Sequence, residues 1–560
     1  MHRFVEKGVD YTNYAYVGEL IYVTAVYLTL FFLHNKKAFQ ILISIFVSAE
    51  AIAMGNFVTL GHGYDTTYNN GYYQNAQFKK VLDEIAKNDP SYYRVYSPLG
   101  DAYSVNNGFV NNYNTAAFFH SLYNYEVNDF TLWTGLRNGT SSVSGDYRGK
   151  YQDLDNLLGV KYYFISKNKS KYYQIEENNP GQYIANVPFD FEENKAYEEL
   201  NDNYFVFENK SLSEFGYSYS TLYCGALKSE DDAVRFGVES IKNIMTLSSY
   251  AVVSEKDTRD ILAKYPDLGL KTETPKHEGL RRLEYEKAIK ARYYYLEDYA
   301  KRYPFEDIPN IPDKYTEKSY SVDHNDKNKQ AMNYYMFVKA KDPTQPLFKE
   351  GTTLYIRAPF YNSRKYNFYF LDNNNKIFMF DAHDDDTTDN VNYMRGFYIK
   401  RDVYTMAVCP KYFESFLYTS TIQIFAEDKA VYEARRDNLN ANPIENVKYV
   451  RDNFTFDTKY DKSQFVISRV AYDKGWSIKA KNNDTGETFD VKTYKGNGAF
   501  VSFVAPKGNI SYTMSYMTPY LELSYIVSAL SVTGFFASLV GYHLFVEKKN
   551  RYLDNIHREN

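Results

Sequence analysis

Tryptophan, cysteine and net charge are all scarce in this chain of 560 residues. It holds two tryptophans, Trp133 and Trp476, beside 60 tyrosines and 39 phenylalanines, and its two cysteines are Cys224 and Cys409. The formal net charge is only -5, which argues against a nucleic-acid partner because such a partner normally requires a basic face. The two cysteines form either one long-range disulfide or two free thiols, and the sequence leaves both open.

The chain also lacks the short motifs of common catalytic sites. It has no G-x-S-x-G, Walker, dinucleotide-binding or H-E-x-x-H sequence, so a soluble hydrolase is not supported. The densest acidic stretch, residues 381–389, fails as a calcium loop starting at Asp384. Asp389 stands at the required glycine position and Arg395 at that of the bidentate glutamate, so we interpret the stretch as a solvated β turn and predict no metal site.

Long apolar runs are present in three places. Residues 14–33 and 38–60 open the chain, and residues 521–545 lie near its end. Each run is about as long as the roughly 20 residues that cross a bilayer core, and the first pair lacks the cleavage site of a signal peptide. We therefore predict three transmembrane helices, two within residues 1–60 and one within residues 520–560.

Basic residues beside these runs predict the orientation. Lys36 and Lys37 separate the first two runs, and four lysines and arginines follow the last one within residues 548–558. Because positive flanks stay in the cytoplasm, we place the C-terminus there and the long central region outside. The mean hydropathy of −0.54 agrees with most of the chain lying in water. The N-terminus then also lies outside, which suggests that further membrane helices precede this chain.

Patterning divides the central region into four parts. These are residues 61–228, 229–330, 331–440 and 441–519. The first alternates helical stretches with short strands and predicts an α/β domain. The second is charged and helical in pattern, most clearly at 278–304, and ends in a linker. The third has short alternating strands, typical of a β-sandwich or jelly roll. A short helix at 443–451 leads into the fourth, a small C-terminal β module.

The expected fold class is therefore an α+β membrane protein with three transmembrane helices and a large extracytoplasmic region. Within the membrane, two acids stand out, Glu19 and Glu50. A buried acid in a bilayer is costly and usually faces protein or water. Glu50 is a candidate for contact with a lipid phosphate through a cation, or with a basic residue on a preceding helix. Alternatively, Glu50 packs against polar neighbours and Glu19 lies near an interface.

The two tryptophans are candidates for contact with a sugar or another acceptor. Trp476 follows Asp473-Lys474-Gly475, a turn sequence, and its indole face is suited to stacking on a sugar ring. More often such a tryptophan closes a small β core after a glycine turn, and we favour that interpretation. Trp133 is equally ambiguous. No residue of the chain is predicted to be catalytic.

Several short motifs, taken in order, resemble a known family. They are YYRVY (92–96), NNG (106–108), FFHSLYN (118–124), NLLGVKYYF (156–164), VFEN (206–209), DKGW (473–476) and APKG (505–508). With the apolar run that follows TPYLEL, the chain looks like the C-terminal half of YfhO-type bacterial membrane proteins, which in turn resemble GT-C glycosyltransferases. The resemblance implies a polyprenyl-phosphate-linked sugar as donor and transfer on the outer face, with lipoteichoic or wall teichoic acid as acceptor.

Two functions follow from these observations. The first is that of the C-terminal part of an envelope glycosyltransferase, with an ectodomain that positions a glycopolymer above a membrane-embedded site. In GT-C enzymes the catalytic acid usually lies in an early external loop, which would precede this chain, so no catalytic residue is carried over. The alternative is a non-catalytic, membrane-anchored ectodomain that binds carbohydrate or protein. The predicted location in both cases is the bacterial cell membrane.

Overall fold

The structure is a computed structural model, and the chain divides into two compact units, Met1–Gln74 and Asn75–Asn560. The described residues are 5–6, 9–10, 76–96, 113–115, 118–119, 125–136, 144–145, 151–167, 183–229, 237–284, 286–294, 306–307, 331–357, 365–384, 394–410, 422–450 and 453–559. In the first unit they form one antiparallel pair, β1 (Val5–Glu6) and β2 (Val9–Asp10). The predicted helices at 14–33 and 38–60 lie outside the described residues.

The expected fold with three transmembrane helices is corrected by the structure. Within the described ranges, no helix combines the length and the apolar character that crossing a membrane requires, and the second unit is mostly sheet. The final helix, α12 (Leu521–Glu559), covers the predicted run at 521–545 and continues through a charged segment. The prediction counted uncharged residues as apolar, although serine, threonine, glycine, tyrosine and histidine interrupt the run.

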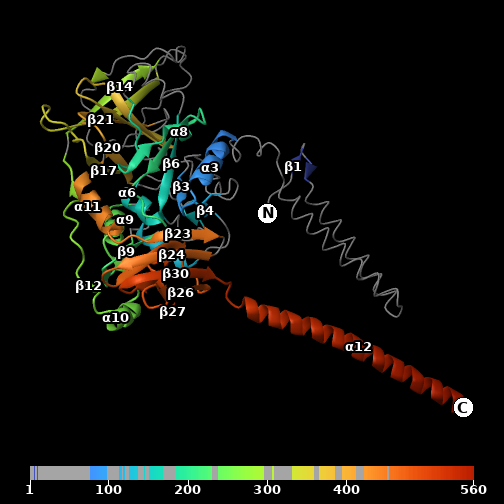
Figure 1. The fold of residues 1–560 in the computed structure, drawn as a ribbon. Helices are drawn as coiled ribbons and strands as arrows, with labels where there is room; N and C mark the ends of the chain where they lie inside the picture. The colour runs from blue at the N-terminus through green and yellow to red at the C-terminus, as the bar shows by residue number, and fades with distance from the viewer. Residues whose placement is uncertain are drawn as a thin grey trace. The chain divides into compact units, whose positions relative to one another are not determined.

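The second unit begins with a small α/β layer (Figure 1). Its elements are α3 (Ala76–Asn88), β3 (Arg94–Tyr96), α6 (Gln152–Leu158), β6 (Val160–Ser166), β7 (Phe191–Glu193), α8 (Lys195–Glu198) and β8 (Tyr204–Asn209). The sheet order is β3-β6-β8-β7. Phe78, Val81 and Ile85 share one face of α3 and are buried with side chains of β3, β6 and β8. The apolar spacing of residues 75–87 predicts a helix and residues 92–98 a short strand, and α3 and, within the described residues, β3 confirm these predictions.

A second small layer is a parallel sheet with two helices. It contains β10 (Thr221–Tyr223), α9 (Val238–Leu247), β11 (Ala251–Val252), α10 (Glu255–Lys264) and β12 (Gly269–Lys271). Strands and helices alternate along the chain, and the strand order is β11-β10-β12. Inside the sequence span of the first layer, between β3 and α6, lie four short elements: β4 (Phe118–Phe119), η2 (Tyr125–Val127), α5 (Asn128–Trp133) and β5 (Ser144–Gly145).

The predicted helix at 278–304 is wrong, because the described part of this stretch forms strands. β13 (Arg281–Arg282) and β14 (Glu286–Tyr294) each join a sheet of the next layer. The alternating charges were interpreted as a solvated helix. The same alternation also suits a strand with one exposed face, and pairing of β14 with β16 along its full length decides between the two.

The β-sandwich predicted for residues 331–440 is present and extends beyond those bounds. Its further strands are β15 (Glu306–Asp307), β16 (Ala331–Lys339), β17 (Thr352–Arg357), β18 (Lys365–Leu371), β19 (Ile377–Asp384), β20 (Arg395–Ile399), β21 (Thr405–Pro410) and β22 (Gln423–Asp428). The sheets are β13-β22-β17-β20 and β15-β14-β16-β21-β18-β19. Leu354 and Phe397 of the first share a core with Phe368 and Met406 of the second. The predicted domain boundaries themselves remain predictions.

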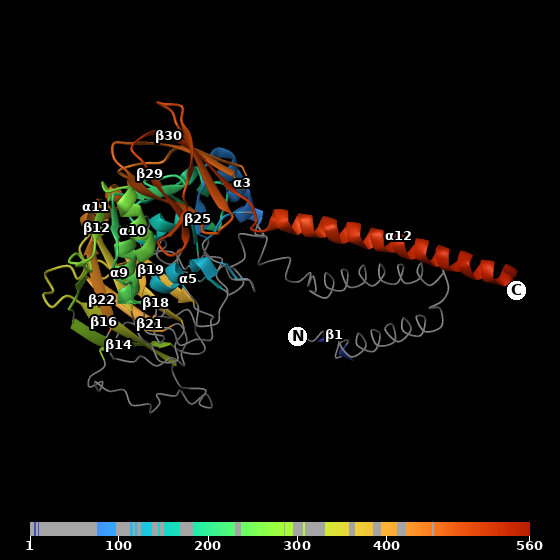
Figure 2. The same ribbon diagram turned by 90° about the horizontal axis from the view of Figure 1, so that it is seen from below.

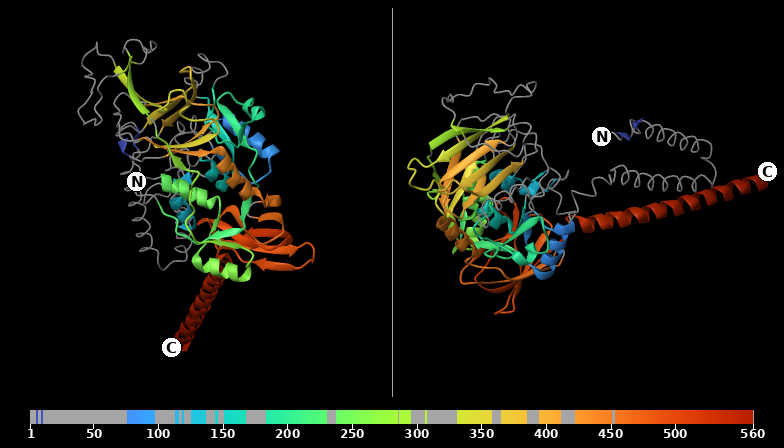
Figure 3. Two further views of the ribbon diagram at one scale, coloured as in Figure 1. Left: turned by 90° about the vertical axis from the view of Figure 1, so that its left-hand side faces the viewer. Right: turned by 90° about the horizontal axis from the view of Figure 1, so that it is seen from above.

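The C-terminal β module is a second sandwich, preceded by helix α11 (Lys429–Asn440) (Figure 2). Its strands are β23 (Glu445–Val450), β24 (Asn453–Tyr460), β25 (Gln464–Ala471), β26 (Trp476–Asn482), β27 (Thr488–Val491), β28 (Tyr494–Gly496), β29 (Phe500–Ala505) and β30 (Gly508–Tyr516). One sheet is β23-β24-β30-β26-β27 and the other is β28-β29-β25-β9, completed by β9 (Gly216–Tyr219) from far upstream (Figure 3). The predicted helix at 443–451 is wrong, since β23 lies there.

A hairpin turn attaches this module to the parallel layer. Asn497, between β28 and β29, is fully buried and has φ +49°. Its backbone N–H donates to the Val252 carbonyl at 2.7 Å, and its side-chain oxygen accepts from the Val252 N–H at 2.9 Å. Asn497 thus satisfies the edge of β11 as a further strand residue would. Asparagine suits the position because it tolerates left-handed backbone.

Replacing Asn497 with alanine is expected to lower the free energy of unfolding by about 2–3 kcal/mol. The change leaves the buried Val252 N–H without its acceptor and puts an ordinary residue in left-handed backbone. Asn375 is a matched control, because it has φ +59° but lies exposed in a β turn. Urea unfolding should show a clearly smaller loss for Asn375→Ala, and equal losses would mean that the Val252 contact adds nothing.

Candidate functional site

Aromatic side chains gather at one end of the C-terminal β module. This group, called the aromatic end below, consists of Tyr92, Tyr449, Phe454, Trp476 and Tyr516. The Tyr449 and Phe454 rings stack with centroids 5.7 Å apart, and Tyr92 lies edge-on to both, at 5.5 and 5.4 Å. Trp476 contacts Phe454 at 6.0 Å and Tyr516 at 5.1 Å. The five rings therefore form one continuous cluster.

Strand register explains why these rings meet. Tyr449 pairs with Phe454 across β23 and β24, and Trp476 pairs with Tyr516 across β26 and β30. Cross-strand pairs lie on the same face of a sheet. The turn before Trp476 is tight, because the Asp473 carboxylate accepts from the Gly475 N–H at 2.7 Å. A Cβ at position 475 would collide with the Met517 carbonyl, so glycine allows the turn to close against the end of β30.

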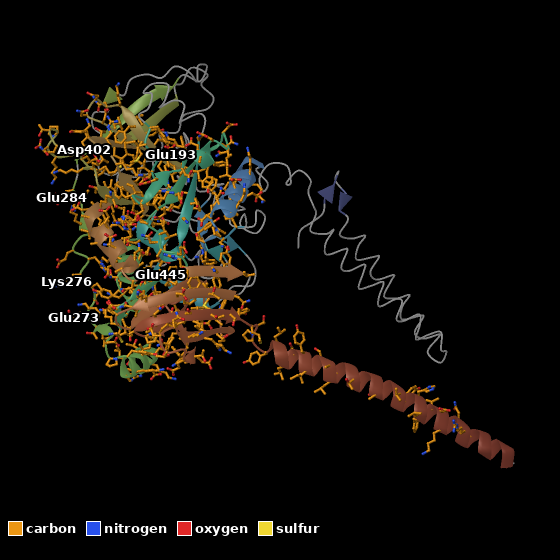
Figure 4. The ribbon with its side chains drawn as sticks, in the orientation of Figure 1. Glu193, Glu273, Lys276, Glu284, Asp402 and Glu445 are labelled. Carbon is orange, nitrogen blue, oxygen red and sulfur yellow. The ribbon has the colours of Figure 1, made fainter. Side chains whose placement is uncertain are left out.

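Burial decreases from the centre of the aromatic end to its edge. Phe454 is buried, Tyr92, Trp476 and Tyr516 are half-buried, and Tyr449 is 38% exposed. Trp476 packs against the core shared by the two sheets, in agreement with the favoured interpretation that it closes a β core. Tyr449 lies at the opposite end of β23 from Glu445, which is labelled in Figure 4. The exposed part of the Trp476 side chain lies at the same end of the sheet as Tyr449. The predicted sugar contact at Trp476 stays a prediction.

The other sequence candidates lie elsewhere. Trp133 ends α5, packs against a different core cluster from Trp476, and accepts a hydrogen bond on its backbone carbonyl from the Asn243 side chain at 2.9 Å. The structure thus does not bring the two tryptophans into one site, and Trp133 stays a predicted sugar contact. Glu19 and Glu50 lie outside the described residues.

Two further expectations concern metals and cysteines. Asp381 to Asp384 end strand β19 rather than forming a turn, and Asp381 is buried beside Arg395 at 3.6 Å, so the turn interpretation is wrong for these residues. Residues 385–389 lie outside the described part. No group of metal-ligand residues occurs in the ranges that the structure describes. Cys224 is a free thiol, so the alternative of a disulfide is not realised.

A buried ionic network joins α6 and α11, and the sequence pattern did not predict it. Arg435 donates to Asp153 at 3.2 and 2.7 Å and to Glu427 at 2.6 and 2.9 Å, which gives two bidentate pairs. Both carboxylates are almost fully buried. Burial raises the pKa of Glu427, and the Arg435 guanidinium partly offsets this rise. Burial alone would lower the pKa of Arg435, but the two carboxylates outweigh it and raise that pKa. The short bidentate geometry favours the ion pair at neutral pH.

The same helices carry a second set of buried polar contacts. Arg436 and the Tyr432 hydroxyl both donate to Asp190, and Tyr432 also accepts from the Asn156 side chain at 2.8 Å. The Tyr163 hydroxyl of β6 donates to Asp155 of α6. Burial raises the pKa of Asp155 well above its usual range. These contacts pair titratable groups of different layers with one another, so we interpret them as structural and not catalytic. Each such set of polar contacts between layers is called a joint below.

A buried arginine forms the third joint. Arg469 on β25 donates from Nε and Nη2 to the Asn156 carbonyl at 3.0 and 2.8 Å, and from Nη1 to the Ser213 carbonyl. Burial lowers its pKa to about 10, so it stays charged at neutral pH. The acceptor carbonyl lies in the last turn of α6, where the helix dipole favours a cation. Gly159, at φ +76°, ends that helix and leaves room for the arginine.

The family described as "Bacterial membrane protein YfhO" matches residues 6–528. The chain belongs to the YfhO family. This membership confirms the resemblance and associates the chain with a membrane. Among curated proteins, it is similar to "Uncharacterized protein YfhO" of Bacillus subtilis (strain 168), with 27% identity over 110 residues. That match covers 18% of this chain and 12% of the relative.

Similarity to solved structures adds nothing to this assignment. A variant of oxalate decarboxylase from Bacillus subtilis covers 33% of this chain and 65% of its own length, with 9% identity and a TM-score of 0.08. A likeness of this size carries no argument on fold or activity. The family membership therefore rests on sequence.

Proposed function

We propose that this chain is the C-terminal part of a glycosyltransferase-like protein of the bacterial envelope, and that its β-rich unit positions a glycopolymer acceptor for sugar transfer. The sugar donor would be a polyprenyl-phosphate-linked sugar, and the acceptor a cell-wall polymer such as teichoic acid. The central unit would lie outside the cytoplasm, and the chemistry would reside in a part of the protein that precedes this chain. Membership of the YfhO family supports the class of protein.

The observation that carries the acceptor role is the aromatic end. A glycopolymer presents C–H faces of its sugars, which pack on aromatic rings, and polar edges, which hydrogen-bond to hydroxyls and lysines. Tyr449, Trp476 and Tyr92 offer aromatic faces for the sugar rings, and the two tyrosines add hydroxyls for the polar edges. All three lie at the edge of the sandwich. Lys448 and Lys474 are exposed beside them and suit a polymer that carries phosphates.

The three joints support the positioning part of the proposal. Arg469 fastens the C-terminal module to α6, and Arg435 fastens α11 to α6. An acceptor held at the aromatic end would thus keep a fixed place relative to the rest of the unit. A non-catalytic binding protein is the second candidate, and the same aromatic end would serve it. Transfer activity separates the two.

Replacing Tyr449 with alanine is expected to weaken binding of a purified teichoic-acid fragment by about three- to tenfold, because the most exposed ring of the cluster is lost. Tyr449→Phe keeps the ring and should retain most of the affinity. Val431→Ala, at a side chain of equal exposure on α11 (37% against 38%), is the control and should bind as the unchanged chain does. The measurement is a titration of the full chain in detergent.

Transfer of labelled sugar in membranes that contain the chain then tests the enzyme class. If Tyr449→Ala lowers both binding and transfer, the acceptor-positioning role stands. Loss of binding with unchanged transfer would rule out the acceptor-positioning role. No transfer above that of membranes without the chain would favour the non-catalytic alternative. Unchanged binding in Tyr449→Ala would remove the aromatic end from the proposal.

A further inference from the structure

Exposed large apolar side chains are concentrated at one place of the β-rich unit. Leaving α12 aside, the described residues of this kind are Leu270, Val431, Tyr449, Val450, Met517 and Tyr520. Leu270 and Val431 lie on β12 and α11. The other four lie at the end of β23 and in the segment that joins β30 to α12, and three of them are more than half exposed: Val450 at 72%, Met517 at 54% and Tyr520 at 81%.

Backbone pairing shows that these four residues share one end of the sheet. Val450 pairs with Asn453, and Asn453 pairs with Ser515, two residues before Met517. The Met517 N–H donates to the Gly475 carbonyl at 3.0 Å, which holds it beside the turn before Trp476. Tyr520 lies three positions after Met517 and directly precedes Leu521, the first residue of α12. The apolar surface thus runs from β23 across the end of β30 to the helix.

The same surface continues onto the first turns of α12 and is flanked by basic residues. Leu523, Tyr525 and Ile526 are 55%, 66% and 57% exposed. Lys448 on β23 and Lys474 in the turn are exposed beside it. Tyrosines and apolar side chains between lysines are typical of surfaces that settle at a membrane–water interface, where rings lie at headgroup level and cations meet anionic lipids.

We propose that the strand–helix junction formed by Val450, Met517 and Tyr520 docks on the headgroup layer of a bilayer, which leaves the neighbouring Tyr449 ring, on the other face of β23, for the acceptor. The occupant is lipid because the chain belongs to a family of membrane proteins and because isolated apolar patches of this kind are otherwise unfavourable in water. The docking concerns the surface of the bilayer and requires no residue to cross it. One consequence of the docking rests on the proposed function. If the aromatic end holds an acceptor, docking would present that acceptor at the lipid surface, beside a lipid-linked donor.

The two tryptophans of the chain allow a direct test. Trp476 lies at the proposed docking surface and Trp133 lies in a different core cluster. In the full chain, Trp133→Phe leaves Trp476 as the reporter, and Trp476→Phe leaves Trp133. Each variant is placed in bilayers of phosphatidylcholine and phosphatidylglycerol, with or without bromine on the lipid chains near the headgroups. Bromine quenches only fluorophores that it touches.

Brominated lipid is expected to lower Trp476 emission at least about twofold and to leave Trp133 emission nearly unchanged, since interfacial rings lie at the depth of the bromines. The double variant Val450→Asp, Met517→Glu should reduce the quenching of Trp476, and both side chains are exposed enough for the fold to tolerate the change. Equal quenching of the two tryptophans, or none of Trp476, overturns the proposal.

The other occupants give distinct results. If lipid does not quench Trp476 but a teichoic-acid fragment shields it from a soluble quencher, the surface binds glycan and the lipid proposal fails. If cross-links join two chains through position 517, the surface is an interface between copies, and the lipid proposal fails as well. Fragment binding in detergent, read with Tyr449→Ala, tests the proposed function separately, so the two can fail independently.

Discussion

Replacing Arg469 with methionine is expected to lower the free energy of unfolding by about 3–5 kcal/mol, one of the two largest effects for a single change in this chain. The side chain is buried and uses three N–H groups on the carbonyls of Asn156 and Ser213. Methionine fills much of the volume but donates nothing, so two buried carbonyls lose a charged donor. The measurement is urea unfolding followed by circular dichroism.

A surface arginine provides the control. Arg281 pairs with Asp428 at 2.8 Å, and the two side chains are 49% and 57% exposed. Because exposed pairs contribute about 0–1 kcal/mol, Arg281→Met should change stability little. Similar losses for the two variants would show that the buried hydrogen bonds of Arg469 contribute no more to the free energy of unfolding than the exposed ion pair of Arg281 does.

A double-variant cycle with Gly159 tests the geometry of this joint. A Cβ on Gly159 would collide with the Arg469 side chain, and the residue has φ +76°. Gly159→Ala should therefore be strongly destabilising alone and less so in an Arg469→Ala background. Alanine lacks the Cδ and Nε atoms that the new Cβ would meet, while the backbone strain remains. If the loss in the double variant equals the sum of the two single losses, the Arg469 side chain does not lie against Gly159.

The α6–Gly159–β6 segment illustrates what the sequence was able to predict. The pattern of residues 151–166 predicts a helix end, a glycine turn and a buried strand, and α6, the left-handed Gly159 and β6 confirm this prediction. Each signal is local: apolar spacing, a glycine at the stop and a β-branched and aromatic run. The strands of the sandwich were predicted on the same grounds.

The joints escaped prediction because their partners are distant in sequence. Arg469 and Asn156 are 313 positions apart, and Arg435 and Asp153 are 282 apart. One signal was available: Arg469 interrupts an apolar strand at a position where alternation would put an inward residue, and arginine is rarely buried without a partner. The β14 strand was missed for a similar reason, since pairing with β16 outweighed its local pattern.

Replacing Arg435 with methionine is expected to cost about 3–5 kcal/mol at neutral pH, because two nearly buried carboxylates, Asp153 and Glu427, lose the cation that both contact. Arg259→Met is the control, since its pair with Glu255 is exposed and 4.0 Å long. Adding Glu427→Gln and Asp153→Asn to Arg435→Met should recover part of the loss, because the stranded charges are then absent.

The pH dependence of this loss has a definite sign. Burial already raises the pKa of Glu427 in the folded chain, and removing Arg435 takes away a contribution that lowers it. A carboxyl whose pKa is higher folded than unfolded keeps its proton better in the folded state. Folding is thus favoured below the unfolded pKa of about 4.3, and this contribution disappears as the pH rises through the folded value. The variant should gain stability relative to the unchanged chain as the pH falls from 7 toward that range.

Urea unfolding of both chains at pH 7 and pH 4.5 checks this expectation. A difference between the chains that shrinks on acidification means that the cost of Arg435→Met is electrostatic and lies in the unpaired carboxylates. A difference that stays constant would mean that the methionine packs poorly between α6 and α11. The contribution of Arg435 to stability would then come from packing and not from charge. The first outcome makes the joint between the α/β layer, the sandwich and α11 dependent on charge. The unpaired carboxylates then destabilise the variant at neutral pH, and mild acid relieves part of that loss by protonating them.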